Sequence, residues 1–401
     1  MNLQIADIDD DIANNVTVES PSPMDNNSIS SFFAELINDL QSSKRPLILS
    51  GRGIRASNSI DAFNNFIEKF NLPVVTSLLG FDNIQYEHPN RIGFIGTYGN
   101  RWANYALGSC DVLLVLGSRL DLRQTGADII SFKEGKKIYH VDIEEAELNN
   151  RITGCKTLRA NLKDFFHHAN QQDSVMLDLN DWRAELTQHY QKRKDTDELK
   201  NISGVNPNEF IHHLSNVSKT AKVITTDVGN NQMWASQSYE LKSSQIFLSS
   251  GGMGAMGFSL PAAIGACFAT GKAPVVAIAG DGGFQINIQE LQTIRRNNLP
   301  VKIIILNNHS LGMIRQFQDS YFDSCYQSTV WGYDTPDFAK VANAYNIDAF
   351  SIKNAEDVEL GLAKLWDNPT EPFLLDISLD LHTNVYPKMM FGSPITKMDP
   401  Q

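Results

Sequence analysis

Two short polar clusters, each directly after an apolar run, most constrain how this 401-residue chain can fold. Gly280-Asp281-Gly282-Gly283 follows the apolar residues 274–279, and Asn307-Asn308 follows the largely apolar residues 301–306. Apolar residues at helical spacing between 287 and 298 predict a helix there, so the region has the order strand, glycine turn, helix, strand. Both turns then open at the carboxyl ends of neighbouring parallel strands, where open α/β sheets bind ligands. The sequence therefore predicts that Asp281 and Asn308 face one crevice.

The residue types in these clusters suit a diphosphate held by a metal ion. The glycines let the backbone approach phosphate oxygens closely. A carboxylate, an amide oxygen and a backbone carbonyl are hard oxygen ligands of the kind that Mg²⁺ prefers. The alternative is an ordinary strand-to-helix turn and an Asn-rich strand end, because short glycine motifs alone are weak indicators.

The paired clusters, at this distance from each other, resemble the motif of thiamine-diphosphate-dependent enzymes. The segments 250–258, 260–265 and 311–316 narrow the resemblance to the acetolactate (acetohydroxyacid) synthase branch. The resemblance extends from about residue 30 to about residue 390. It implies an α/β fold of two doubly wound parallel-sheet domains, the middle domain and the diphosphate-binding domain of the family.

The resemblance also implies a set of site residues. Asp281, Asn308 and the backbone carbonyl of Ser310 would bind Mg²⁺, and Met256 would bend the cofactor by pushing between its two rings. A core methionine filling an irregular gap is the alternative for Met256. The positions that would bind the cofactor are Gly229, Asn230, Asn231, Gly254, Met256, Gly280, Asp281, Gly282, Gly283, Asn308, Ser310, Leu311, Gly312 and Met313.

Two positions depart from the family pattern. Asn231 stands where the family commonly has histidine, and an amide cannot carry a proton at neutral pH. Phe317 stands where acetohydroxyacid synthases typically have a tryptophan that helps to select the acceptor ketoacid. The identity of the acceptor is therefore left open.

The pattern divides the chain into four segments. Residues 1–27 form an acidic linker or arm, 28–170 a middle domain, 171–205 a solvated helical linker and 206–401 the diphosphate-binding domain. In the resembled family, an acidic connector of this kind follows a domain that binds the aminopyrimidine ring and carries the activating glutamate. The resemblance thus implies that the chain corresponds to the last two-thirds of a three-domain enzyme and needs that domain from elsewhere.

Two stretches of the middle domain bear on FAD, which only some members of the family bind. Gly51-Arg52-Gly53 and the segment 117–126 each follow a predicted strand, and the second resembles the segment along the flavin adenylate. Its arginines could pair with the flavin diphosphate. Tight turns at strand ends would explain the glycines without a ligand, so FAD stays an open expectation.

Composition excludes several classes of partner. A net charge of −12 argues against a surface for nucleic acid or anionic membrane, and no apolar stretch reaches 18 residues. The four cysteines show no metal-binding spacing and indicate reduced thiols in a cytoplasmic protein. The expected partners are a 2-oxo acid substrate and either a second copy of the chain or a separate pyrimidine-binding domain.

The resulting functional hypothesis is a thiamine-diphosphate- and Mg²⁺-dependent, acetolactate synthase-like enzyme. It would decarboxylate a 2-oxo acid such as pyruvate and transfer the two-carbon unit to a second carbonyl. One alternative is a catalytically incomplete cofactor-binding or regulatory fragment. The other is a related decarboxylase or lyase that acts on another 2-oxo acid or on an acyl-CoA.

Overall fold

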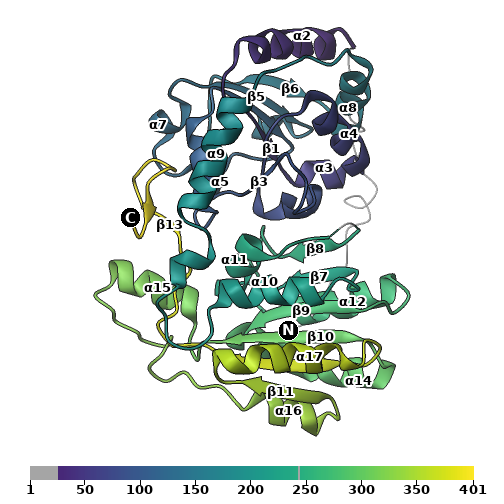
Figure 1. The fold of residues 1–401 in the computed structure, drawn as a ribbon, viewed down its shortest axis with the longest axis vertical. Coiled ribbons are helices and arrows are strands. Elements are labelled where there is room, and N and C mark those ends of the chain that lie inside the picture. Colours follow the sequence, from purple (N-terminus) through teal and green to yellow (C-terminus); the bar gives the residue numbers. More distant parts are fainter. Residues whose placement is uncertain (1–25, 243) are drawn as a thin grey trace, which may run out of the picture.

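The computed structural model describes residues 26–242 and 244–401, which form two α/β domains stacked end to end (Figure 1). Each is built on a six-stranded, wholly parallel sheet, which confirms the predicted fold class. Nearly all of the predicted acidic arm, residues 1–25, lies outside the described residues. Asn26 and Asn27, its last two residues, begin helix α2.

The sheet of the first domain has the strand order β3-β2-β1-β4-β5-β6. This order reverses direction between β1 and β4, and such a switch point opens a crevice at the carboxyl ends of the strands. The strands are β1 (Pro46–Ser50), β2 (Val74–Thr76), β3 (Arg91–Phe94), β4 (Val112–Leu116), β5 (Lys137–Asp142) and β6 (Lys156–Arg159).

Helices cover both faces of this sheet because its central strands are apolar on both faces. In β1, Ile48 packs into one core while Leu47 and Leu49 pack into the other. One face carries α2 (Asn26–Ser42), α3 (Arg52–Ala56), α4 (Ile60–Phe70) and α8 (Leu162–Gln171). The other carries α5 (Arg101–Ser109), α7 (Ile129–Lys133) and α9 (Asn180–Lys192), and α6 (Leu122–Thr125) follows the loop after β4.

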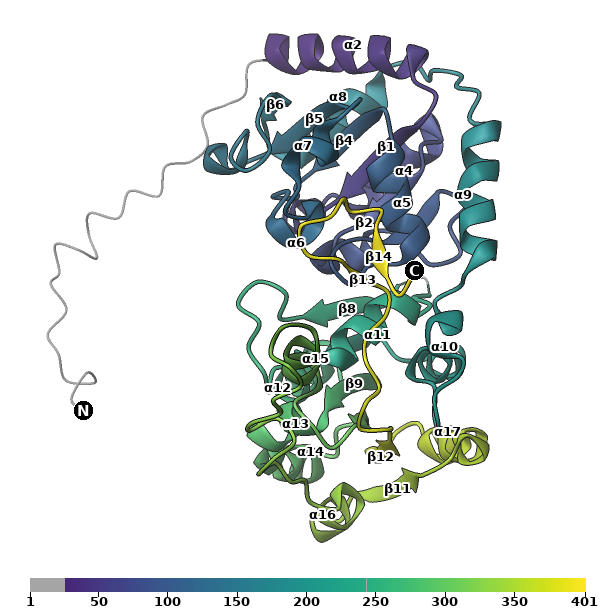
Figure 2. The ribbon, with the colours of Figure 1, turned by 90° about the vertical axis from the view of Figure 1, so that its left-hand side faces the viewer.

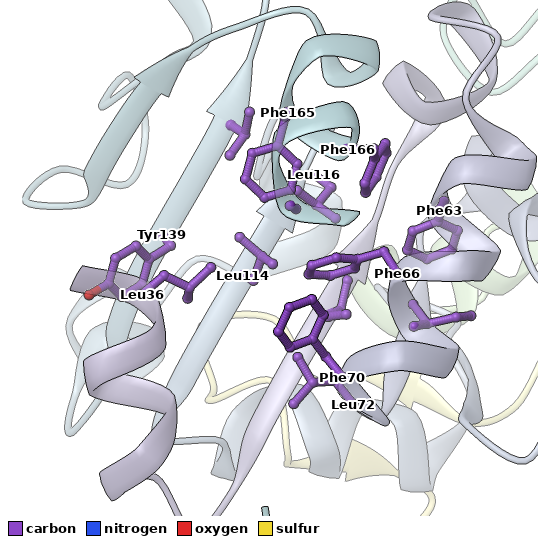
Figure 3. Packing of buried hydrophobic residues seen from close by; sticks show 14 of the residues in the cluster. Leu36, Phe63, Phe66, Phe70, Leu72, Leu114, Leu116, Tyr139, Phe165 and Phe166 are labelled. Carbon is purple, nitrogen blue, oxygen red and sulfur yellow. The ribbon is translucent and has the colours of Figure 1, made fainter. Parts of the chain in front are cut away.

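An aromatic cluster holds α4 and α8 together above the sheet (Figure 3). The ring of Phe66 lies 4.8 Å from that of Phe70 and 6.0 Å from that of Phe165, centroid to centroid. Offset and edge-to-face pairs of this kind stabilise a core beyond the area that they bury. The loops at the switch point are thus carried by a rigid scaffold.

The sheet of the second domain has the order β11-β12-β10-β9-β7-β8, with its switch point between β7 and β9. Leu306 of β10 lies opposite Gly280 of β9, so Asp281 and Asn307 come at the same level of neighbouring strands. The strands are β7 (Val223–Thr226), β8 (Ile246–Ser249), β9 (Val275–Gly280), β10 (Val301–Asn307), β11 (Asp348–Ile352) and β12 (Phe373–Ser378).

Helices again cover both faces of this sheet. Asn206 caps α10 through its side chain and Pro207 opens the helix. One face carries α10 (Pro207–Val217), α11 (Asn230–Ser238) and α17 (Val358–Asp367). The other carries α12 (Ser259–Ala269), α14 (Leu291–Asn297) and α16 (Phe338–Ala344), and α15 (Gly312–Tyr321) follows the loop after β10.

The helix predicted over 287–298 differs from the observed structure. The chain forms α13 (Asp281–Ile286), a short 3-10 turn (Ile288–Glu290) and then α14. Helix formation starts six residues earlier than predicted because Gly280 is an extended N-cap residue and Asp281 starts the helix directly. The glycine cluster is therefore the first turn of a helix.

The connecting segment also differs from its prediction as a solvated helix. Helix α9 runs along one side of the molecule from the first domain toward the second (Figure 2), and Trp182 and Leu186 are buried as its anchors. Beyond α9, however, Asp195 and Glu198 are buried. Glu198 forms ion pairs of 2.8 Å with both Arg101 and Arg193, so ion pairs hold the charged segment to helix α5 of the first domain.

The C-terminal tail is ordered and ties the domains together. The side-chain amide of Gln316 exchanges two hydrogen bonds with the backbone of Val385, and the Met389 amide donates to Thr97 O of the first domain at 2.7 Å. Short strands β13 (Lys388–Met389) and β14 (Met398–Asp399) pair antiparallel.

None of the helices in residues 26–242 and 244–401 combines the length and the apolar character needed to span a bilayer. All four cysteines are free thiols, and Cys110, Cys155 and Cys267 are buried.

Candidate functional site

A cavity of about 210 Å³ lies at the switch point of the second domain. It opens at the carboxyl ends of β7, β9 and β10, where the fold predicts a ligand. All fourteen residues that the sequence assigned to the cofactor line it, together with Val228, Leu306 and Ile314. The structure therefore brings the whole predicted set together.

Two glycines beside this cavity leave no room for a side chain. A Cβ on Gly283 would lie 2.3 Å from Oδ1 of Asp227, and a Cβ on Gly312 would lie 2.3 Å from Nδ2 of Asn308. Such contacts are far inside van der Waals distance, so only glycine permits these approaches. The glycines at these positions keep the polar side chains close to the helix starts.

The carboxylate of Asp281 is fixed by two backbone amides. Gly282 N donates to Oδ1 at 2.9 Å and Ser310 N donates to Oδ2 at 3.1 Å. Burial raises the pKa of Asp281 to about 7, although these two amide hydrogen bonds act in the opposite direction. A cation at this carboxylate would favour its ionised form, which is the behaviour expected of a metal ligand.

The neighbouring asparagines have different surroundings. Asn307 donates to Asp376 Oδ1 at 3.2 Å and accepts from the amide of His309, so its side chain braces the turn. Burial raises the pKa of Asp376 to about 6, against the hydrogen bond from Asn307. Asn308 instead lines the cavity. This division agrees with the sequence-based choice of Asn308, and not Asn307, as the ligand position.

Several buried polar oxygens around the cavity have no hydrogen-bond partner among the described residues. They are Asn230 Oδ1, Asn231 Oδ1 and Ser310 Oγ. Buried polar atoms are nearly always paired, and an unpaired group costs about 1–3 kcal/mol. A bound polar group or hydrated cation would satisfy them. The residues therefore fit a metal diphosphate, although no cluster of three His, Cys, Asp or Glu occurs in the described part of the chain.

Met256 is 37% exposed and lines the cavity, so the alternative of a buried core methionine is wrong. Its Cε would lie 3.3 Å from a Cβ placed on Gly282. The thioether thus reaches across the opening of the cavity toward the first turn of α13.

Asp227 is a structural residue of the site that the sequence analysis did not assign. Its carboxylate accepts hydrogen bonds of 2.9 Å from the amides of Val228, Gly257 and Ser259. Burial raises its pKa against these bonds. The carboxylate fixes the loop that carries Met256. Its position directly after β7, like that of Asp281 directly after β9, was the available signal.

A second cavity of about 750 Å³ lies between the domains and shares Val228, Gly229 and Met313 with the first. Both loops considered for FAD line it, through Arg52 and through residues 117–119, 121, 123 and 124. The glycines of these loops serve mutual packing, because a Cβ on Gly51 would lie 2.1 Å from Gly117 O. Phe317 lies at the same cavity.

Comparison with known families defines the class of protein. Residues 33–168 match the family described as "Thiamine pyrophosphate enzyme, central domain", and residues 227–377 match "Thiamine pyrophosphate enzyme, C-terminal TPP binding domain". The chain therefore belongs to the thiamine pyrophosphate (thiamine diphosphate) enzymes.

Within that class, the chain is similar to acetolactate synthase large subunits. It is 34% identical to the acetolactate synthase large subunit of Lactococcus lactis over 89% of this chain and 61% of that protein. It is 36% identical to acetolactate synthase 1, chloroplastic, of Oryza sativa over 89% of this chain and 56% of that protein. It is 33% identical to the acetolactate synthase isozyme 2 large subunit of Escherichia coli over 90% of this chain and 64% of that protein. The chain thus spans less than two-thirds of the length of each of these relatives.

Proposed function

We propose that this chain forms the diphosphate-binding part of a thiamine-diphosphate- and Mg²⁺-dependent, acetolactate synthase-like enzyme. The enzyme would decarboxylate a 2-oxo acid such as pyruvate and transfer the two-carbon unit to a second carbonyl. The single observation that carries the proposal is that fourteen residues chosen from sequence line one cavity at a sheet switch point. The similarity to acetolactate synthase large subunits gives it independent support.

In this proposal, Asp281, Asn308 and the Ser310 carbonyl bind Mg²⁺, and the amides at the start of α13 hold the diphosphate. A helix N-terminus with closely packed glycines favours an anion. When bound, thiamine diphosphate supplies an electron-accepting ring for decarboxylation and carboligation. Met256 would hold the bound cofactor in its reactive conformation, and Leu311 and Met313 would exclude water from the reacting atoms.

The proposal also requires a pyrimidine-binding partner. No glutamate lines either of the two cavities of about 210 and 750 Å³ in the described part of the chain. We therefore propose that the activating glutamate comes from a pyrimidine-binding domain that packs over the cavity, within a homo-oligomer or from a separate polypeptide. Exposed Ile314 and Phe317, beside the opening, offer apolar surface for such a contact.

We propose FAD as the occupant of the larger cavity. Its volume of about 750 Å³ is in the range of cofactor sites, and Arg52, Arg119 and Arg123 line it. Guanidinium groups pair well with diphosphates. The strand order of the first domain, with both loops at its switch point, is that of dinucleotide-binding folds.

The proposal names a 2-oxo acid and does not restrict the substrate to pyruvate. Phe317 is half-exposed and packs against Tyr321 at 4.6 Å between ring centroids. Phenylalanine has no ring N–H with which to bind a substrate oxygen, and Asn231 cannot exchange a proton. These two residues favour a second candidate, a related enzyme with another 2-oxo acid or an acyl-CoA as substrate.

We propose a cytoplasmic location, supported by the four free cysteines, which suit a reducing compartment. The rice relative is named as chloroplastic, so fractionation of cells that produce the tagged protein would decide between compartments.

The test of function is a decarboxylation assay with the 401-residue chain, thiamine diphosphate, Mg²⁺ and a panel of 2-oxo acids that includes pyruvate. The assay is run with and without a pyrimidine-binding domain from an acetolactate synthase. We expect activity when the domain is added, and its loss in Met256→Ala but not in Met253→Ala, because Met253 is 94% exposed and lines neither cavity. Cofactor binding without turnover of any substrate would support a binding or regulatory role instead.

A further inference from the structure

A third cavity, of about 260 Å³, lies at the junction of the two domains and shares no lining residue with the two cavities above. Its walls come from the first domain, from helix α9, which runs alongside the junction (Figure 2), from the segment that follows α9, and from Gln237 of helix α11 in the second domain.

Arg91 provides the cavity with a cation that lacks an anionic partner. Its guanidinium carbon lies 4.8 Å from the ring centroid of Tyr86 and 5.5 Å from that of Phe81. No carboxylate of the described residues lies within 4.0 Å of the guanidinium. Burial lowers the pKa of Arg91, which reflects the loss of water around the charge. The charges of Asp195 and Glu240 raise the pKa of Arg91 from beyond that distance, so the guanidinium has no direct ion pair and is available to an anion.

The other charged groups of the cavity are already paired. Arg183 donates to Asn71 O at 2.7 Å and to Asn90 Oδ1 at 2.6 Å. Asp195 accepts from His212 Nε2 at 2.7 Å and from the Ser238 hydroxyl at 2.5 Å. Arg183 is thus held by uncharged oxygens and Asp195 by two donors, whereas the guanidinium of Arg91 forms no hydrogen bond with the described residues.

The walls around Arg91 are largely apolar. Trp102 and Tyr190 pack edge to face with centroids 4.8 Å apart, and Ile92 and Leu186 line the cavity beside them. A volume of about 260 Å³ accommodates only a small molecule. An arginine fork pairs with a carboxylate through two parallel hydrogen bonds, and the apolar walls would bury a short hydrocarbon tail.

We propose that this cavity binds a small carboxylate, whose charged end pairs with Arg91 and whose apolar end packs between Trp102 and Leu186. The site is separate from the proposed cofactor cavities and does not depend on the proposed function. A ligand there would contact strand β3, helix α9 and Asp195 together, and would thereby connect the first domain to the segment leading into the second.

The test is calorimetric titration of the 401-residue chain with isobutyrate, with isobutyramide as its uncharged isostere and inorganic phosphate as a second anion. We expect isobutyrate to bind and isobutyramide not to bind. Arg91→Met should weaken binding at least tenfold, and Arg91→Lys, which keeps the charge but loses the fork, should weaken it less. Arg119→Met is the matched control, because Arg119 lines the larger cavity, and should leave binding unchanged.

Hydrogen exchange with and without isobutyrate locates the site. Protection is expected in the segments 86–92 and 183–190. Equal affinity in Arg91→Met, protection confined to 117–124, or no binding of isobutyrate would overturn the proposal. If phosphate binds and isobutyrate does not, the proposal that the cavity binds a carboxylate is wrong. Arg91→Lys keeps the test informative if Arg91→Met does not fold.

Discussion

The backbone amide of Ser310 donates a 3.1 Å hydrogen bond to Oδ2 of Asp281, although the two residues are 29 positions apart. The bond joins the loop after β10 to the helix start after β9. Since Gly282 N holds the other carboxylate oxygen, the two turns of the candidate metal site form one unit. A change at either turn is therefore expected to disturb the other.

Replacing Gly283 by alanine tests the close approach beneath the site. The new Cβ would lie 2.3 Å from Asp227 Oδ1, and three amide hydrogen bonds prevent that carboxylate from moving. Overpacking of this kind costs about 1–3 kcal/mol of unfolding free energy. Urea denaturation should show this loss for Gly283→Ala.

Gly265→Ala in helix α12 is the matched control, because a Cβ there meets no atom within 4 Å. Alanine in a helix should keep or raise stability, by about 0.5–1 kcal/mol. Equal stability of the two variants would show that the contact with Asp227 is not restrictive.

Gln316→Ala tests the attachment of the C-terminal tail. The substitution leaves the buried N–H and C=O of Val385 without their partners, which costs about 1–3 kcal/mol. We expect lower stability and faster hydrogen exchange over residues 383–390. Gln289→Ala, at an exposed position, should change neither. Unchanged exchange in Gln316→Ala would mean that other contacts hold the tail.

His212 gives the protein a pH-dependent contribution to stability. Burial alone would lower the pKa of His212, but the hydrogen bonds and charges of Asp195 and Glu240 outweigh it and raise the pKa. A raised histidine pKa stabilises the fold below the unfolded value of about 6.5, and this contribution disappears as pH rises through the folded pKa.

Denaturant unfolding at pH 6 and pH 8.5 would measure this contribution. The stability difference between the wild type and His212→Asn should be larger at pH 6. The neighbouring His213, which is half-exposed and 3.9 Å from Glu359, provides the control His213→Asn, for which we expect little difference. An equal effect of His212→Asn at both pH values would contradict the assignment.

Flavin retention tests the larger cavity. If FAD occupies it, Arg52→Met and Arg123→Met should each lower the affinity about tenfold or more, which corresponds to about 1.4 kcal/mol. The readout is flavin absorbance per chain after reconstitution and gel filtration. Arg159→Met, at an exposed ion pair on β6, should retain flavin like the wild type. If the wild-type chain takes up no flavin, the proposal that FAD occupies the larger cavity is contradicted.

The sequence predicted the central strands well because they are apolar on both faces, as β4 and β10 are. It missed β3, β6, β8 and β11, which are short and carry exposed or half-exposed residues. All four lie at sheet edges, where only part of a strand is covered and the apolar pattern weakens.

The candidate site was predicted more completely than the fold around it. Its residues follow recognisable strand ends, so the motif and the topology agree. The position of Asp227 after β7 was an available signal, but its hydrogen bonds to the amides of Gly257 and Ser259 and the third cavity around Arg91 could not be predicted, because both depend on contacts between segments far apart in the sequence. Likewise, the prediction of a solvated linker over 171–205 misses the buried Asp195, because its partner His212 lies on helix α10, outside that segment.

The measurement that tests the central claim most directly is calorimetric titration of the chain with thiamine diphosphate, with and without Mg²⁺. Asp281→Asn is the decisive variant, because it keeps the shape of the side chain and removes the charge that binds the metal. Asparagine has one side-chain acceptor and cannot accept from both Gly282 N and Ser310 N, so urea denaturation of the variant without metal is measured alongside to separate a loss of stability from a loss of metal binding.

We predict Mg²⁺-dependent binding by the wild type, no binding of thiamine without its diphosphate, and at least a hundredfold weaker binding by Asp281→Asn, about 2.7 kcal/mol. Binding that is independent of Mg²⁺, equal affinity in Asp281→Asn, or no binding by the wild type would contradict the assignment of this cavity as the metal diphosphate site.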